Sequence, residues 1–153
     1  MSETTQYATF YLDGLFLGVE VQQVQEVIRF QPMTPVPLAP AIVQGLINLR
    51  GQIVTAIDLR RRLSLPPRTG ERRPMNVVVR SEDGAVSLLV DEIGDVVEVH
   101  EEDCERPPET LPPSARELIT GVCKLRDRLL LILDTERAVN LPAAVVPATG
   151  TGF

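Results

Sequence analysis

The feature that most constrains this chain is an internal repeat. The segment VQGLINLRGQIVTAIDLRRRL at 43–63 aligns with ITGVCKLRDRLLLILDTERAV at 119–139 without a gap, at a constant shift of 76 residues. The apolar positions of the two segments correspond almost throughout. The identical pairs include Gly45 and Gly121, Leu49 and Leu125, Arg50 and Arg126, Asp58 and Asp134, and Arg61 and Arg137. Similarity at one fixed spacing indicates a duplication, so we expect two structural units built on the same plan.

Each copy contains an apolar strand, a tight polar turn, a second apolar strand and then an aspartate. The turns lie at 50–51 and 126–127, and the aspartates are Asp58 and Asp134. A carboxylate at that place can accept hydrogen bonds from the first N–H groups of a helix, and its charge suits the positive helix end. We therefore predict a short helix after each aspartate. The expected helices cover 59–63 and 135–139.

Two Asp-Gly pairs predict further hairpins. Asp13-Gly14 and Asp83-Gly84 each stand between two apolar runs. A type I′ turn needs positive φ at both central residues, which Asp tolerates and Gly adopts freely. The composition agrees, because Val, Leu and Ile supply most of the 44% hydrophobic residues, and β-branched side chains favour strands.

Two repeats of about five short strands predict a mainly β fold of two small five-stranded barrels, since closure removes unpaired edges. A lobe of roughly 65 residues buries too little surface to be stable alone. We therefore expect both barrels, with their short helices, to pack around a shared hydrophobic core. The expected single domain covers 5–141, with subdomains at about 5–65 and 75–141 and a polar linker at 66–74. The uncharged tail, 142–153, is expected to be flexible.

A second polar stretch, 101–114, contains five acidic residues and four prolines. Proline cannot donate to a strand ladder, so we predict a surface loop here. Ser114 precedes Glu117 by three residues, as in a capping box. A short helix capped by Ser114 and running through Leu118 is therefore expected.

The net charge of −6 argues against binding to nucleic acid or anionic lipid, because neutralising phosphates needs clustered Lys and Arg. The densest basic group, Arg60 to Arg62, is followed by Arg68, Arg72 and Arg73; we interpret it as a solvated helix end and linker. No apolar run approaches the roughly 18 residues of a membrane span, and the start of the chain lacks a signal-peptide pattern. A cytoplasmic protein without membrane insertion is expected.

The cysteines, Cys104 and Cys123, are single and widely spaced, which matches neither a disulfide framework nor a paired metal motif. We expect both to be reduced, with Cys123 acting as a small buried hydrophobic residue. His100 is the single histidine and adjoins an acidic loop, so we interpret it as an exposed structural residue.

Two further patterns are negative. Asp91, Glu92 and Asp95 lack the spacing of a calcium loop, and a solvated charge run is expected there. A Gly-rich phosphate loop is also missing from the sequence. The sequence therefore predicts no catalytic residue, no metal site and no cofactor.

Four segments resemble the successive signatures of CheW-like domains, and the similarity runs from about Tyr7 to Asn140. Its most specific element is Gly-Leu-Ile-Asn-Leu-Arg-Gly followed by Ile-Asp-Leu-Arg, in that order and spacing. The four segments are GVEVQQVQEVI at 18–28, TPVPLAP at 34–40, VQGLINLRGQIVTAIDLR at 43–60 and GVCKLRDRLLLILDTER at 121–137.

The resemblance implies two five-stranded SH3-like barrels around a common core, in agreement with the duplication. It also implies a non-enzymatic adaptor that couples chemoreceptors, the methyl-accepting chemotaxis proteins, to a CheA-type histidine kinase. The expected partners are the regulatory domain of that kinase and the cytoplasmic tips of the receptors. Such an adaptor would be recruited to membrane-associated receptor arrays, and ring assembly with the kinase is expected to be feasible.

Carried over residue by residue, the resemblance places Glu26 and Arg50 near the receptor tip. It makes Val21, Val24 and Gly45 candidates for contact with the kinase or the receptor. Two alternatives stay open: both valines could be core residues, and Arg50 could form an internal pair with Glu26.

This sequence departs from the family pattern at Thr55 and Ala56, where Pro and Val are common, and at 126–127, where Asp-Gly is frequent. The subfamily is therefore left open. An oligonucleotide-binding small β-barrel is the alternative function, and it would need a basic, aromatic face. An enzyme would need a pocket that holds His100 together with a cysteine or a serine.

Overall fold

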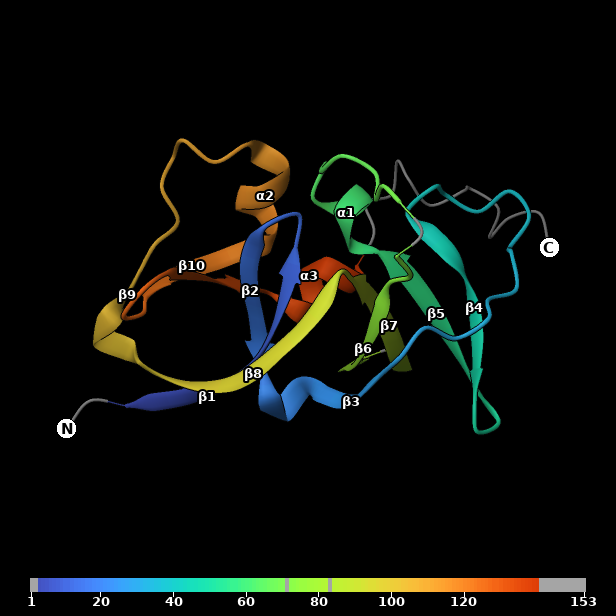
Figure 1. Ribbon diagram of the computed structural model, residues 1–153, viewed down its shortest axis with the longest axis horizontal. Helices are drawn as coiled ribbons and strands as arrows, with labels where there is room; N and C mark the ends of the chain where they lie inside the picture. Colours follow the sequence, from blue (N-terminus) through green and yellow to red (C-terminus); the bar gives the residue numbers. More distant parts are fainter. Residues whose placement is uncertain (1–2, 71, 83, 141–153) are drawn as a thin grey trace.

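The computed structural model describes residues 3–70, 72–82 and 84–140. Within these ranges the fold is mainly β, as expected, and two sheets lie side by side and pack with three short α-helices (Figure 1). The strands are β1 (Thr4–Leu12), β2 (Leu15–Glu20), β3 (Val24–Ile28), β4 (Val43–Leu49), β5 (Gln52–Asp58), β6 (Met75–Ser81), β7 (Gly84–Val90), β8 (Glu92–His100), β9 (Cys104–Glu105), β10 (Ile119–Lys124) and β11 (Leu129–Leu133). The α-helices are α1 (Leu59–Arg62), α2 (Pro113–Leu118) and α3 (Thr135–Val139), and the 3₁₀ turns are η1 (Val21–Gln23) and η2 (Glu101–Asp103).

The two sheets exchange hairpins between the sequence repeats. The five-stranded sheet has the order β3-β6-β7-β5-β4, and the six-stranded sheet has the order β8-β1-β2-β11-β10-β9. Each sheet thus combines the first hairpin of one repeat with the later strands of the other. Parallel pairs, β5 with β7 and β11 with β2, join the exchanged parts.

This exchange differs from the expected division into consecutive subdomains at 5–65 and 75–141. The linker at 66–74 connects β5 and α1 to β6, and both strands belong to the five-stranded sheet. A hairpin has the same strand periodicity and the same turn residues whether it pairs with strands of its own repeat or with strands of the other repeat. Local sequence signals therefore could not reveal the exchange. The expected flexible tail at 142–153 lies outside the described residues.

The duplicated segments adopt matching structures. The register of β4 against β5 shifts between Val43 and Gly45, and the register of β10 against β11 shifts at the equivalent place, between Ile119 and Gly121. This shared bulge supports the duplication that the sequence indicates.

Both predicted aspartate caps are confirmed. The Asp58 carboxylate accepts a hydrogen bond from the Arg60 N–H at 3.0 Å, and Asp134 accepts one from the Arg137 N–H at 3.1 Å. Helix α3 has the expected bounds, whereas α1 ends at Arg62, one residue early. The Ser114 cap is wrong, because α2 begins at Pro113 and no side chain caps it. Proline supplies the preset φ of a first helical residue there.

Both Asp-Gly positions join antiparallel strands. Asp13 and Gly14 have φ values of 51° and 80° between β1 and β2, as the predicted type I′ turn requires. Strands β6 and β7 also pair, with Ser81 opposite Gly84, while residue 83 lies outside the described part.

The expected shared core is present, and both sheets contribute to it. One buried cluster contains Phe10 and Leu17 from the six-stranded sheet and Ile57 and Leu88 from the five-stranded sheet. Helix α3 lies between the sheets in Figure 1 and adds Ala138. The two sheets therefore stabilise one another through common apolar burial.

Each sheet also has a smaller apolar cluster on its other face. Strand β6 shows the arrangement: Val77 and Val79 face the shared core, and Val78 faces the cluster inside the five-stranded sheet. Strand β11 behaves likewise, with Leu133 in the shared core and Leu130 in the cluster of the six-stranded sheet. Burial on both faces explains why these strands are apolar runs rather than alternating patterns.

The expectation of two reduced cysteines is wrong. Cys104 and Cys123 form a disulfide, and they are directly opposite one another on β9 and β10. The expected burial of Cys123 is confirmed, because its side chain is fully buried. The cysteines are 19 residues apart, and β9, which places Cys104 opposite Cys123, has only two residues. So short a strand has no recognisable periodicity, and the sequence therefore did not indicate the bond.

The interpretation of Arg60 to Arg62 as a solvated helix end is also wrong for two of the three residues. Arg60 and Arg62 are 9% and 7% exposed. Arg62 donates to the Arg137 carbonyl at 3.0 Å, which links α1 to α3. Arg60 donates to the Pro66 carbonyl at 2.7 Å, whereas Arg62 Nε is buried without a hydrogen-bond partner among the described residues.

Asp91 likewise departs from the expected solvated run. Its carboxylate accepts hydrogen bonds from Arg60 at 2.7 and 3.0 Å and from Arg68 at 2.9 and 3.2 Å, and its side chain is 15% exposed. Asp95 is exposed and Glu92 is 46% exposed, as expected. The difference arises because only Asp91 lies at the corner where α1 approaches.

Candidate protein-binding site

Glu26 and Arg50 lie at the two edges of the five-stranded sheet. Glu26 belongs to β3, the first strand of that sheet, and Arg50 belongs to the turn after β4, the last strand. Arg50 Nη2 nevertheless donates to Glu26 Oε2. The sheet therefore curls until its edges meet, and this ion pair spans the gap between them.

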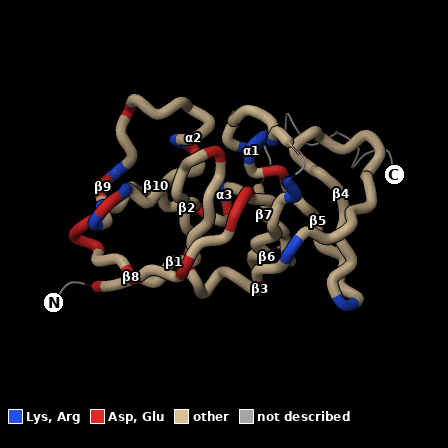
Figure 2. The backbone as a smooth tube through the Cα atoms, viewed as in Figure 1, with Lys and Arg blue, Asp and Glu red and all other residues tan. Residues whose placement is uncertain are grey.

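Arg50 occupies a tight turn with φ +51°, followed by Gly51 with φ +88°. The Asn48 side-chain oxygen accepts the Gly51 N–H at 2.9 Å and so holds the turn. Figure 2 shows basic charge at the tip of this hairpin, away from the rest of the molecule. The turn projects its arginine into solvent.

The Arg50 side chain is 72% exposed, whereas that of Glu26 is 18% exposed. The pKa of Glu26 is lowered, chiefly by the hydrogen bond from Arg50. Arg50 is therefore exposed and at the same time pairs internally with Glu26, which was one of the alternatives. A guanidinium has five N–H donors in a planar fork, so one pair leaves donors for another acceptor.

Gly45 lies where two backbone segments approach closely. A Cβ at this position would lie 2.9 Å from the Thr34 carbonyl oxygen and 3.0 Å from the Met33 Cβ. Thr34 and Leu46 exchange two backbone hydrogen bonds of 2.8 Å across the same contact. Gly45 therefore has a packing role, because a side chain here would push the two segments apart.

The two valines differ in their surroundings. Val24 begins β3 opposite Val79 and packs against the shared core. Val21 begins η1 and is half-buried. The core alternative therefore applies to Val24, while part of Val21 remains open to a partner.

Sequence reasoning missed two apolar features of the surface. Ile53 lies opposite Asn48 near the tip of the β4–β5 hairpin and is 64% exposed. The strand alternation gave a signal, because Val54 faces inward and its neighbour must face outward. The second feature is an apolar hollow of about 260 Å³ between the β1–β2 hairpin, the end of α1 and the start of α2. Its lining includes Leu15, Leu63, Leu65, Leu111 and Ala115.

The outer edge of the six-stranded sheet is acidic. Strand β8 is the edge strand, and it is followed by the exposed acidic turn Glu101–Asp103. Figure 2 shows red segments along this side of the molecule. Such an edge repels phosphates and does not fit the basic, aromatic face of an oligonucleotide-binding barrel.

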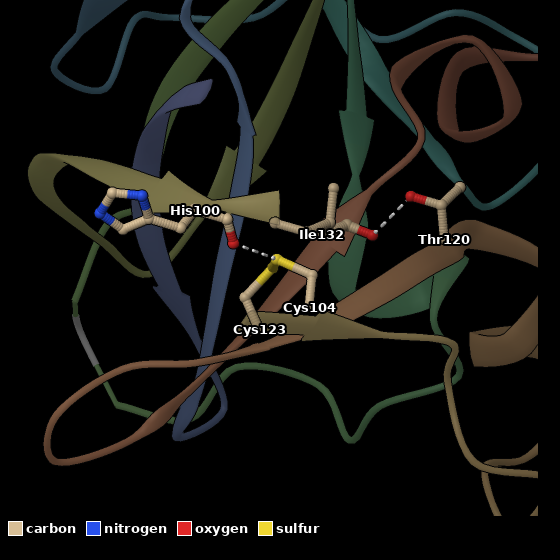
Figure 3. Close-up of a disulfide and its surroundings, with 5 residues drawn as sticks. All are labelled: His100, Cys104, Thr120, Cys123 and Ile132. Atoms are coloured by element: carbon tan, nitrogen blue, oxygen red, sulfur yellow. Dashed lines mark hydrogen bonds between the residues drawn. A yellow bond between two sulfur atoms is a disulfide. The ribbon is translucent and has the colours of Figure 1, made fainter. Parts of the chain in front are cut away.

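The His100 side chain does not face either cysteine. Figure 3 shows the His100 imidazole pointing away from the disulfide, in which each cysteine sulfur is bonded to the other. Across the described ranges, no group of three or more His, Cys, Asp or Glu side chains could hold a metal ion. No helix in the described part of the chain is both long and apolar enough to span a membrane.

Comparison with known proteins gives a consistent result. The family model for the CheW-like domain matches residues 6–143. A chemotaxis protein CheW from Treponema pallidum is 32% identical over 88% of this chain and 82% of its own length. Another from Bacillus subtilis is 33% identical over 86% of this chain and 84% of its own length.

A solved structure shows the same fold. The scaffolding protein TtCheW from Thermoanaerobacter tengcongensis matches with a TM-score of 0.83 at 24% identity. The match covers 95% of this chain and 99% of that protein. By sequence and by fold, the chain belongs to the family of CheW-like domains.

Proposed function

We propose that this protein is an adaptor that couples chemoreceptors to a CheA-type histidine kinase in chemotaxis or chemosensory signal transduction, and that it acts without catalysis. The observation that carries the proposal is the family match over residues 6–143, together with relatives named as chemotaxis proteins. The functional unit is the single domain at 5–141. It works in the cytoplasm and is recruited to membrane-associated receptor arrays.

The receptor side of the proposal depends on the hairpin tip. Arg50 uses one nitrogen for Glu26 and keeps further N–H donors in solvent. These donors suit carboxylates or carbonyl oxygens on a helical receptor tip, because a planar guanidinium can bind two oxygens at once. Glu26 orients the arginine for this contact.

The neighbouring residues support the same surface. Val21 is half-buried, and its open part is proposed to contact the kinase or the receptor. Val24 anchors β3 on the shared core, and Gly45 lets the 33–34 segment approach β4. These residues hold Glu26 and the hairpin in place, so changes in them are expected to weaken partner binding indirectly.

The kinase side of the proposal depends on the fold. Two sheets around one core form a rigid body with separate surfaces. If one surface holds the regulatory domain of the kinase and another holds the receptor tip, a receptor movement can change kinase activity. Because the resemblance implies the same two-barrel fold in that regulatory domain, head-to-tail contacts could close into rings.

A binding experiment tests the kinase contact. The purified protein is mixed with the regulatory domain of a CheA-type kinase from the same cell, and association is measured by calorimetry. We expect binding at tens of micromolar or tighter. Absence of binding in that range would contradict the kinase contact.

A charge reversal tests the receptor contact. Arg50→Glu is expected to weaken receptor coupling at least tenfold, because it removes a cation and places two carboxylates together. Arg126→Glu, at the equivalent position of the other repeat, is the matched control and should retain coupling. The double variant Glu26→Arg/Arg50→Glu restores an internal pair but not the receptor contact. Full recovery in the double variant would mean that Arg50 acts only through Glu26.

A further inference from the structure

We propose that the Cys104–Cys123 disulfide is a reversible redox site, reduced by dithiols, which controls whether β9 covers the outer edge of β10. This inference does not depend on the identity of any partner. The internal repeat, the position of β9 and the open side of Cys104 support it.

The repeat shows that covering this edge is a regular part of the fold. Strands β4 and β10 are equivalent, and Leu46 corresponds to Val122 at the shift of 76 residues. Thr34 pairs with Leu46, and Glu105 pairs with Val122. In both sheets, therefore, a short segment pairs with the same position of the same strand and covers its edge.

The two covering segments approach the strand to different degrees. A Cβ on Gly45 would lie 2.9 Å from the Thr34 carbonyl oxygen, whereas a Cβ on Gly121 would lie 3.4 Å from the Glu105 carbonyl oxygen. The contact over β10 is thus the looser one. It is also the one that carries a disulfide, between residues that face each other on β9 and β10.

Little else holds β9 in place. It has two residues and two register pairs with β10, and it connects an exposed acidic turn to a loop with three prolines within 106–112. Glu105 and Lys124 form an ion pair at 3.6 Å, but their side chains are 68% and 64% exposed. Exposed pairs contribute little. The disulfide is therefore the main tie between β9 and β10.

The disulfide is accessible from one side. Both cysteines line an open hollow of about 470 Å³ beside the start of β1. Cys104 is half-buried, whereas Cys123 is fully buried in the apolar cluster of the six-stranded sheet. A thiolate in the hollow can therefore reach the Cys104 sulfur, and Cys123 is the leaving group.

The exchange is balanced with a dithiol as the reductant. Its thiolate attacks Cys104 Sγ, the S–S bond breaks, and Cys123 leaves as a thiolate that takes up a proton. The second thiol of the reductant then attacks the reductant sulfur that is bonded to Cys104. This step releases Cys104 as a thiol. Two electrons and two protons pass to the protein, and the reductant becomes a cyclic disulfide. An oxidised dithiol reverses the sequence.

Reduction has a local structural consequence. Cys104 Sγ lies 3.6 Å from the His100 carbonyl oxygen, as Figure 3 shows, so the released thiol has an acceptor on the β8 side. Without the covalent tie, β9 can leave β10 and expose the backbone N–H and C=O groups around Val122. An uncovered strand edge is a template for pairing with another strand. The reduced form therefore presents an interaction edge that the oxidised form hides.

The test compares the oxidised full chain with the same chain in dithiothreitol. Alkylation and mass measurement should find no reactive thiol before reduction and two afterwards, and removal of the reductant in air should reverse the change. Hydrogen exchange of the β10 amides should accelerate about tenfold on reduction. The β4 amides are the internal control and should not change.

A variant separates the disulfide from other effects of the reductant. Cys104→Ser should show the fast β10 exchange without dithiothreitol and no further response to it. Two reactive thiols in the air-exposed chain, or the same β10 exchange in both redox states, would overturn the proposal. If Cys104→Ser does not fold, the comparison on the unaltered chain decides alone.

Discussion

At the scale of single residues, Asp91 connects parts of the chain that the sequence separates widely. Its carboxylate accepts the backbone N–H of Asp13, from the β1–β2 turn, at 2.8 Å, in addition to the bonds from Arg60 and Arg68. Burial alone would raise its pKa. The hydrogen bonds from Arg60, Asp13 and Arg68 outweigh burial and lower the pKa to about 2.

Asp91→Asn is therefore expected to destabilise the protein by about 2 kcal/mol at neutral pH, because it removes the carboxylate that two partly buried guanidinium groups share. Arg60 then keeps only the longer ion pair with Asp13, at 3.5 Å. The lowered pKa also predicts a pH dependence. The contribution is fully present above the unfolded pKa of about 3.9 and is lost as pH falls through the folded value near 2.

Urea unfolding between pH 7 and pH 2 measures both effects. The stability of the unaltered protein should fall more steeply between about pH 4 and pH 2 than that of Asp91→Asn. Glu92→Gln is the control, because its pair with Arg72 joins side chains that are 46% and 68% exposed. Equal losses in the two variants would mean that the Asp91 network contributes nothing specific.

Gly45 gives a second prediction at this scale. Gly45→Ala should cost about 1–3 kcal/mol, because the new methyl group would force the 33–34 backbone away from β4. Gly121→Ala is a matched control from the other repeat, where the nearest contact, at 3.4 Å, is looser. Thermal unfolding of both variants would show the difference, and a larger loss for Gly121→Ala would contradict the account.

At the scale of elements, the two repeats use the same cap at the start of a short helix. Asp134→Ala should cost about 1 kcal/mol, because the Arg137 N–H loses its acceptor. The effect should add to that of Asp58→Ala, because each cap bond is made within its own repeat and the bond from Arg62 to the Arg137 carbonyl, which links α1 to α3, uses neither carboxylate. Denaturant unfolding of the single and double variants checks this, and a double loss far from the sum would show that the helices are coupled.

The same elements show what sequence can predict. The duplicated hairpins, the Asp-Gly turns and the aspartate caps are local patterns, and the structure contains all of the described ones. The exchange of hairpins, the Cys104–Cys123 bond and the Asp91 network each join segments distant in the chain. Such pairings depend on tertiary geometry, which residue types and spacing do not encode. For the site, the exposed Arg50 was predictable from its turn, whereas Ile53 and the apolar hollow were missed.

At the scale of the whole molecule, the exchange of hairpins and the shared core make the two sheets one body. Each sheet contains strands from both repeats. The largest buried cluster contains residues of both sheets. A single cooperative unit is suited to an adaptor. Because the two sheets do not move separately, a displacement at one surface is transmitted to the other.

The most direct test of the adaptor function is the control of kinase activity by receptors. Receptor-containing membranes and a CheA-type kinase from the same cell are assayed with and without this protein, and kinase phosphorylation is followed after a receptor ligand is added. We predict that the ligand changes the rate only when the protein is present, and that Arg50→Glu largely abolishes the response while Arg126→Glu does not. An identical ligand response in the absence of the protein would contradict the account.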